Sequence, residues 1–209
     1  MLSKIKQSWK VKDVRRRILY TLMMILIFRI GTTIPVPGVD TSIISKLVSG
    51  NSLLALYNMF TGGAFSNFTL FALGIGPYIT ASIILQLLTI GFESLDELQK
   101  SGEEGKKKIN KYTKYTALVL AIIQAVGITL GVIKSALTSD SIFSIATVIM
   151  TLVSASMILM WMGDRITEKG LGNGSSIIIF VGIISRIPSD IIGTVSDVQG
   201  GKLALWAAI

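Results

Sequence analysis

The sequence predicts an all-α membrane protein, a polytopic bundle of transmembrane helices. Hydrophobic residues make up 51% of its 209 residues and charged residues only 15%, and the mean hydropathy is +0.67. Soluble domains carry about 25% charged residues, so this composition places the chain in the membrane class. Long apolar runs, and basic flanks on alternate sides of them, make the same prediction.

The predicted spans follow from the lengths of the apolar runs. A hydrocarbon core about 30 Å thick needs roughly 17–25 helical residues. Four runs reach that length, and a fifth is shorter and ends at Pro188: 18–34, 70–90, 116–133, 144–162 and 175–187. We therefore expect a five-span unit over 18–202. A truncated sixth span begins at 203–209, so the chain reads as the front part of a longer protein.

Positive charge alternates along the chain and predicts its orientation. Residues 1–17 hold seven lysines and arginines, and residues 91–115 hold six lysines. The intervening stretches 35–69 and 134–143 hold a single lysine each. Basic loops face the cytoplasm, so we expect five spans with a cytoplasmic N-terminus. The first run is read as a retained span rather than a cleaved signal sequence, because no A-x-A-like site follows it.

The chain contains no cysteine and no histidine. Disulfides, thiolate nucleophiles, zinc sites of the usual kind and histidine-based catalysis are therefore excluded. We expect no cofactor, no metal and no enzymatic activity.

A broken half-span precedes the second long run. The segment 52–66 is apolar but too short to cross a bilayer, and Gly74, Gly76 and Pro77 interrupt the start of the span that follows. Irregular backbone at membrane depth survives only where protein or a water-filled cavity satisfies its hydrogen bonds. The pattern favours a conduit or a transporter over a simple anchor.

Two basic segments allow more than one interpretation. Residues 1–17 place Leu2, Ile5 and Trp9 on one face, which predicts an amphipathic helix in the cytoplasmic interface or else a disordered basic tail. The predicted basic loop 91–115 is either a topology determinant or a docking surface for an acidic or RNA-bearing partner. Its candidate docking residues are Lys106, Lys107, Lys108 and Lys111.

Three further sequence features can be explained by helix packing and capping alone, without a functional role. Arg29 lies about five residues inside the first span, so it either snorkels to the surface or faces the bundle interior and a partner there. The glycine-rich stretch 163–182 predicts a tight turn with an Asn or Ser cap on the next helix. Ile75, Ile79 and Ile83 form a ridge that spacing alone assigns to lipid or core rather than to a pore.

Four long phrases resemble the N-terminal half of the bacterial SecY family, the channel subunits of the Sec protein translocase. They are FRIGTTIPVPGVD, NMFTGGAFSNFTLFALGIGPYITASIILQLL, EEGKKKINKYTKYTALVLAIIQAVG and MWMGDRITEKGLGNGSSIIIF. They occur in the family's order from about Val14 to the end of the chain. Ser175 and Asp164 depart from the common pattern, where an apolar residue and Glu are usual.

The resemblance implies a fold and a set of site residues. SecY proteins have ten spans in two halves around an hourglass pore, and this chain would supply the first half. The segment at about 52–66 would be the plug, with Leu53, Leu56, Asn58, Met59, Phe60, Gly62 and Gly63. The aliphatic pore ring would include Ile75, Ile79 and Ile179. The lateral gate, through which signal sequences reach lipid, would include Thr80, Ser82 and Ile83.

The resemblance also implies partners and a location. The expected partners are the C-terminal half of SecY, SecE, SecG, SecA, the ribosome, the secretory polypeptide with its signal sequence, and membrane lipids. The expected location is the bacterial inner membrane. Two rival classes remain, half of a small-solute secondary transporter and a membrane scaffold or receptor without a conduit. The first predicts a buried ion-coordinating cluster, and the second leaves the broken half-span unexplained.

Overall fold

The computed structural model describes residues 11–139, 141–188 and 191–192. The predicted interfacial helix at residues 1–10 and the predicted sixth span at 203–209 lie outside these residues. The described part is helical, with only two isolated β-bridges, Pro35 with Thr69 and Val39 with Leu137. Its helices are α2 (Lys12–Gly31), α3 (Thr41–Gly50), α4 (Ser52–Phe60), α5 (Gly76–Gly91), α6 (Glu93–Lys100), α7 (Glu103–Gly131), α8 (Ile142–Lys169) and α9 (Gly174–Ile184), with a 3₁₀ turn η1 (Lys134–Ala136). The all-α prediction is confirmed.

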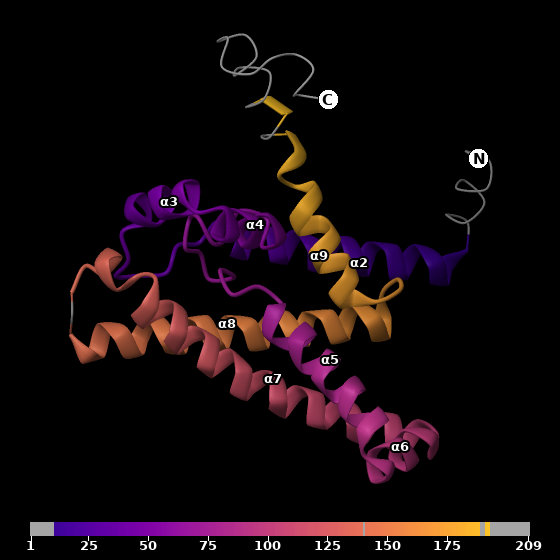
Figure 1. The fold of residues 1–209 in the computed structure, drawn as a ribbon. Coiled ribbons are helices and arrows are strands. Elements are labelled where there is room, and N and C mark those ends of the chain that lie inside the picture. Colours follow the sequence, from indigo (N-terminus) through magenta and orange to yellow (C-terminus); the bar gives the residue numbers. More distant parts are fainter. Residues whose placement is uncertain (1–10, 140, 189–190, 193–209) are drawn as a thin grey trace, which may run out of the picture.

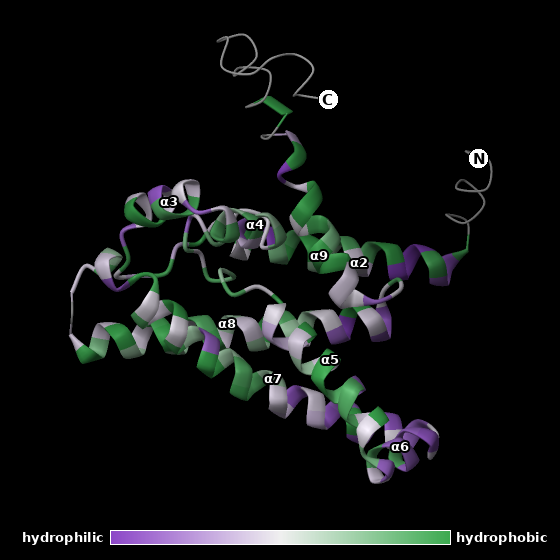
Figure 2. Ribbon diagram, viewed as in Figure 1, coloured by the Kyte–Doolittle hydropathy of each residue, from purple (hydrophilic) through white to green (hydrophobic). Residues whose placement is uncertain are grey.

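The long helices α7 and α8 form the centre of the bundle (Figure 1). Helix α5 lies along α7, whereas α2 and α9 both pack on α8. The short helices α3 and α4 lie together on the far side of α8 from the α6 tip (Figure 1). Hydrophilic residues gather on α6, on the start of α7 and on the start of α2, while the middle of the bundle is hydrophobic (Figure 2).

Helices α7 and α8 are each long and apolar enough to cross a membrane. Helices α5 and α6 reach the same standard only as a pair, and they are bent by 105° at the break between them. Helix α9 is apolar but has 11 residues, and α2 carries arginines in its first two turns and again at Arg29. Two helices, or three if the bent pair counts as one span, meet the criteria for crossing a membrane among the described residues. The five spans expected from the sequence therefore remain a prediction.

A stripe of small residues lets α7 pack closely on its neighbours. Ala117, Ala121 and Ala125 recur every four residues, and all three are fully buried. Thr113 and Thr129 extend the same buried stripe at its two ends. Small side chains at this spacing bring helix backbones close together, which is the usual basis of packing between helices in lipid. Gly127 lies outside this packed stripe, because a β-carbon built on it would meet nothing within 4 Å.

The predicted span 70–90 begins later than expected. Residues 61–75 form turns, and the helix starts only at Gly76, with Pro77 in its first turn. Pro77 lacks a backbone N–H and so suits the first turn of a helix. Phe68, which is fully buried, adopts a left-handed φ of 41°, and its carbonyl accepts a hydrogen bond from the Val36 N–H at 2.9 Å. These tertiary contacts hold the segment before Gly76 out of the helix.

The expected loop 91–115 is largely helical, which corrects its predicted conformation. Helix α6 occupies 93–100, and α7 starts at Glu103, so the four candidate docking lysines lie on the first turns of α7. A β-carbon on Gly105 would overlap the Leu98 carbonyl, so glycine is required for this tight hairpin. Helix α3 had no counterpart in the prediction, although Asp40 caps it by accepting the Ser42 N–H at 2.9 Å.

Candidate functional site

The segment predicted to be the plug, residues 52–66 and called the plug segment below, consists of a short helix followed by a turn. Asn51 caps α4 by accepting the Leu53 N–H at 3.0 Å. The helix ends at Phe60, and Gly62 and Gly63 then reverse the chain with φ values of 67° and 88°. Left-handed conformations of this kind are costly for residues with a side chain. The predicted Gly62 and Gly63 therefore have a specific geometric role at the end of α4.

Two side chains of α4 connect it to the segment before α5. The Tyr57 hydroxyl donates a hydrogen bond to the Leu73 carbonyl at 2.9 Å, and its ring packs edge-on against Phe65, with 5.1 Å between centroids. Asn58 is buried, and its Oδ1 accepts the Ser66 N–H at 2.8 Å. Both bonds run from the helix to the returning chain, so α4 and residues 61–73 form one unit.

The apolar residues predicted for the plug do not share this burial. Leu53 is 78% exposed, and Leu56, Met59 and Phe60 are each about half exposed. Within the described part of the chain, these side chains leave one face of α4 largely uncovered. Large exposed apolar surfaces of this kind indicate a contact with lipid or with another protein surface.

The three predicted ring residues line one recess. Its volume is about 300 Å³. It lies between α9, the start of α5 and the turn at residues 61–63, which we call the plug turn. Its walls include Ile75, Ile79 and Ile179, and the plug residue Phe60 also contributes. The remaining lining residues are Tyr57, Thr61, Leu73, Gly74, Gly76 and Thr80. The lining is mainly apolar and contains no charged side chain.

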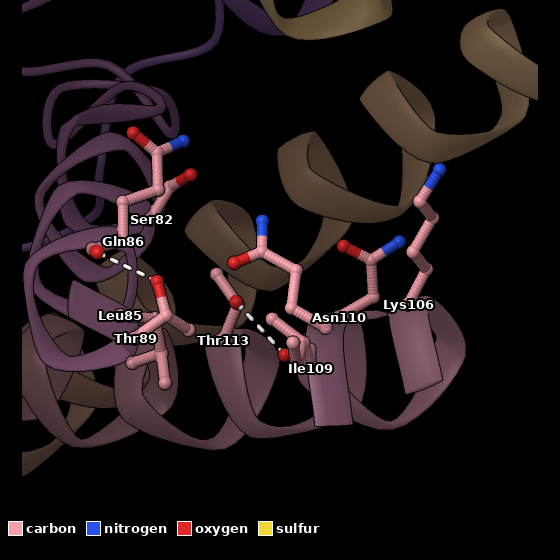
Figure 3. Close-up of a pocket in the computed structure, with 9 residues that line it drawn as sticks. Ser82, Leu85, Gln86, Thr89, Lys106, Ile109, Asn110 and Thr113 are labelled. Carbon is pink, nitrogen blue, oxygen red and sulfur yellow. Dashed lines mark hydrogen bonds between the residues drawn. The ribbon is translucent and has the colours of Figure 1, made fainter. Parts of the chain in front are cut away.

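The three predicted gate residues do not lie together. Thr80 is exposed and borders the recess of the isoleucines. Ile83 is also exposed, but it lines neither this recess nor the second pocket described next. Ser82 instead faces a second pocket of about 280 Å³ between α5, α6 and α7 (Figure 3). The other residues of that pocket are Leu85, Gln86, Thr89, Gln99, Lys106, Ile109, Asn110 and Thr113.

Most of the residues that line the second pocket are polar, and one of them is a candidate docking lysine, Lys106. The amides of Gln86 and Asn110 face the same opening, and Lys106 extends beside them (Figure 3). Lys107, Lys108 and Lys111 are exposed on the same turns of α7, and the Lys111 ammonium lies 5.9 Å from the Tyr115 ring centroid. The four lysines thus form one basic surface at the start of α7.

The glycine-rich turn before α9 has the predicted cap. Asn173 accepts the Ser176 N–H at 3.2 Å, so the expectation of an Asn-capped turn is confirmed. Thr167 accepts the Gly174 N–H at 2.8 Å, and a β-carbon on Gly174 would overlap the Gly163 carbonyl. These contacts fix the angle at which α9 leaves α8, and they therefore position Ile179.

Arg29 has a partner inside the bundle. Its guanidinium donates a hydrogen bond to the Ser185 hydroxyl at the end of α9, at 2.8 Å. Of the two interpretations of Arg29, the structure favours the charge that faces a neighbouring helix. A separate ion pair joins α7 to α8, with Lys114 Nζ 2.6 Å from Asp164 Oδ2.

Three residues of this site were missed from the sequence. Tyr57 and Thr61 line the recess, and Gly182 of α9 touches the plug turn. Tyr57 and Thr61 stand within the predicted plug, but no spacing rule distinguishes them from their neighbours. Gly182 follows Ile179 by three residues, so it lies on the same face of α9, and that spacing was the available signal.

Comparison with known proteins gives a consistent family. The SecY family model matches residues 69–209. The chain is 44% identical over 200 residues to the protein translocase subunit SecY of Buchnera aphidicola subsp. Acyrthosiphon pisum. It is 42% identical over 198 residues to the same subunit of Escherichia coli K12. These alignments cover 92% and 91% of this chain but 46% and 45% of the relatives, so the chain spans about half their length.

Solved structures share the fold. A structure described as a protein-conducting channel matches with a TM-score of 0.68 at 20% identity, covering 93% of this chain and 44% of that one. Sec61 in a canine ribosome–channel complex from the endoplasmic reticulum gives the same values. At this level of identity the likeness concerns the fold alone.

Proposed function

The chain belongs to the SecY family, and on that premise we propose that it supplies the N-terminal half of a bacterial Sec translocase channel subunit. In this proposal unfolded secretory chains cross the membrane between this half and a C-terminal half. Signal sequences and transmembrane segments leave sideways through a lateral gate. The chain performs no chemistry, and a partner supplies the driving force.

One observation carries the proposal: the isoleucines of α5 and α9 line a single recess that the plug turn borders. Ile75 immediately precedes α5, Ile79 lies in its first turns, and Ile179 lies in α9, about a hundred residues further along the sequence. Their convergence gives an aliphatic half-collar beside a displaceable segment. A C-terminal half of matching shape would complete the collar.

An aliphatic collar suits a conduit for many different sequences. Branched apolar side chains offer a passing polypeptide no hydrogen bonds, so they neither hold nor select a particular sequence. When the collar is closed, its apolar surface expels water and so blocks ions. The plug would reinforce the closed state, and its displacement would accompany opening.

In the proposed orientation, α2, α5, α7, α8 and α9 are the five spans of a multi-pass inner-membrane protein. The N-terminus is cytoplasmic, because the basic start of α2 and the α6–α7 hairpin gather on the cytoplasmic side under the positive-inside rule. Thr80 and Ile83 are exposed on α5, in keeping with a role in the gate. Ser82 faces α7, so its part in the gate would be indirect.

The proposed partners follow from what the chain lacks and from its charge. The exposed apolar face of α4 and the open side of the recess would face the C-terminal half, and SecE and SecG would complete the membrane complex. The basic surface formed by Lys106, Lys107, Lys108 and Lys111 would attract acidic surfaces of SecA or the RNA of a ribosome. Such attraction would weaken as salt is raised.

The transporter alternative has little support among the described residues. No group of three or more His, Cys, Asp or Glu side chains in that part of the chain is placed to hold a metal ion. Arg29, the charge found inside a span, is hydrogen-bonded to Ser185. A transporter site for small ions would need a different arrangement.

Site-specific crosslinking tests the proposal. A photoreactive residue replaces Ile75, Ile79 or Ile179 in turn, and the chain is combined in proteoliposomes with the C-terminal half of a relative. A stalled secretory chain should crosslink at all three positions, and removal of its signal sequence should abolish the crosslinks. Ile123, which is exposed on α7, is the matched control and should crosslink to lipid alone.

Assembly of the two halves is checked by co-purification. If the halves assemble and the three isoleucines still crosslink no more than Ile123, they face lipid or core, and the proposed conducting role is wrong.

A further inference from the structure

The plug turn touches α9 where Gly62 meets Gly182, so neither partner has a side chain at this contact. A β-carbon built on Gly62 would lie 2.8 Å from the Gly182 carbonyl oxygen and 2.9 Å from its Cα. A β-carbon built on Gly182 would lie 3.3 Å from the Phe60 carbonyl oxygen. The two backbones are therefore in direct contact. Since neither is the flexible end of a side chain, neither can move aside at little cost.

The plug turn also lies close to the segment before α5. A β-carbon on Gly74, just before α5, would lie 3.3 Å from Cγ2 of Thr61. The plug turn therefore has glycine contacts with both α9, at Gly182, and the segment before α5, at Gly74. Within the plug unit, the hydrogen bond from Tyr57 to the Leu73 carbonyl sets the distance between α4 and the same segment. The position of the turn depends on small residues outside the plug itself.

We propose that Gly182 of α9 is a positioning residue for the plug. Because it has no side chain, the plug turn packs directly against the α9 backbone at this point, which we call the seat. This inference depends on the proposed function for the name and role of the plug, but its geometry is independent of conduction. Gly182 lies one helical turn beyond Ile179, on the same face of α9. The same short helix therefore carries a ring residue and the seat, so a displacement of α9 at the ring would also move the seat.

The size of the side chain at position 182 should control how closely the plug turn packs against α9. An alanine there would require the Phe60 carbonyl to give way by a few tenths of an ångström. A valine adds two methyl groups toward the same backbone and would require a larger displacement. The plug turn should therefore become more exposed in the order Gly, Ala, Val.

Thiol labelling measures this exposure directly. The chain has no cysteine, so Thr61→Cys introduces a unique thiol at a position that is buried under the turn. The reporter chain is reconstituted in lipid vesicles with the C-terminal half of a relative, and its rate of reaction with a water-soluble maleimide is measured. Gly182→Ala should raise the rate, and Gly182→Val should raise it several-fold.

Gly127 provides the matched control for the helical substitution. It lies within α7 and has nothing within 4 Å, so Gly127→Ala and Gly127→Val make the same changes in open space. Both should leave the labelling rate at the level of the reporter alone. Equal rates for the Gly182 and Gly127 series would overturn the proposal.

A second pair covers the case in which Gly182→Val fails to fold. Gly62→Ala introduces a side chain at a φ of 67° and against the Gly182 backbone, whereas Gly38→Ala does so at a φ of 82° with nothing within 4 Å. Both carry the strain of a left-handed alanine. A rise in labelling for Gly62→Ala beyond that for Gly38→Ala supports the seat, and equal rates contradict it.

Labelling separates this inference from the proposed function. If labelling follows the size of residue 182 but the ring isoleucines do not crosslink a secretory chain, the contact is a real packing feature and the conducting role is wrong. If crosslinking succeeds and labelling does not change, the channel assignment holds and the seat does not.

Discussion

The α7–α8 pair and the plug segment are held by different interactions. Helix α7 buries its alanine stripe completely, and an ion pair between Lys114 and Asp164 joins it to α8. The plug segment 52–66 buries Ala64 and Phe65 in the core, and the Tyr57–Leu73 hydrogen bond and glycine contacts also hold it. The apolar face of α4 is mostly uncovered. In the proposed function, the first region (the frame) would stay in place and the second would be displaced.

The difference is one of energy as well as geometry. A buried interface of small residues loses packing along its whole length when it is forced apart, so it separates only at high cost. A single hydrogen bond contributes about 0.5–1.5 kcal/mol net, and the one from Tyr57 to the Leu73 carbonyl joins α4 to the segment before α5. The proposed conducting role would need both regions, because the frame would have to persist while the plug segment moves.

The largest effect is expected in the frame. Ala121→Leu places a larger side chain at a fully buried position of α7, and overpacking of this kind should lower the free energy of unfolding by about 1–3 kcal/mol. Denaturant unfolding in detergent micelles measures it. Ala146→Leu, at an exposed position of α8, is the control and should change stability by no more than about 0.5 kcal/mol. Equal effects at the two sites would mean that α7 is not the tightly packed frame.

A smaller and more local effect is expected at the plug. Tyr57→Phe removes the hydrogen bond to the Leu73 carbonyl and should weaken the attachment of α4 by about 0.5–1.5 kcal/mol. The thiol reporter at position 61 should react faster, while global unfolding should scarcely change. Tyr112→Phe, at an exposed position of α7, should affect neither measurement. A large loss of global stability for Tyr57→Phe would place this tyrosine in the frame instead.

The smallest effect is expected on the open face of α4. Leu53→Ala removes an exposed side chain, so in the chain alone it should change stability by no more than about 0.5 kcal/mol. Its effect should grow when the C-terminal half is present, because that half would cover this face. Unfolding measured with and without the C-terminal half shows the difference. The same small value in both cases would mean that the half does not contact Leu53.

The two regions also differ in how well the sequence predicted them. Hydropathy located α7 and α8 because their apolar runs, 116–133 and 144–162, are continuous and long. It failed around α5, where residues 70–75 are apolar enough for a span but are held in turns by contacts with distant segments such as Val36. It also missed α3 and described the helical start of α7 as a loop, since charged residues conceal a helix from a hydropathy pattern.

Site residues were predictable only through resemblance. Spacing gave the ridge of Ile75, Ile79 and Ile83 but favoured lipid or core, and family resemblance connected Ile179 with it. The structure adds that Ile75, Ile79 and Ile179 share a recess and that Ile83 does not. The spacing from Ile179 places Gly182 on the same face of α9 but does not show its role, which comes from a contact with Gly62, 120 residues away.

Hydrogen exchange tests the division between frame and plug most directly. The chain is assembled with the C-terminal half of a relative, and amide exchange is measured with and without a stalled secretory chain. The amides of α4 and residues 61–68 should lose protection when the secretory chain engages, while those of residues 117–125 in α7 should keep theirs. Equal loss in both regions, or a loss confined to α7, would contradict it.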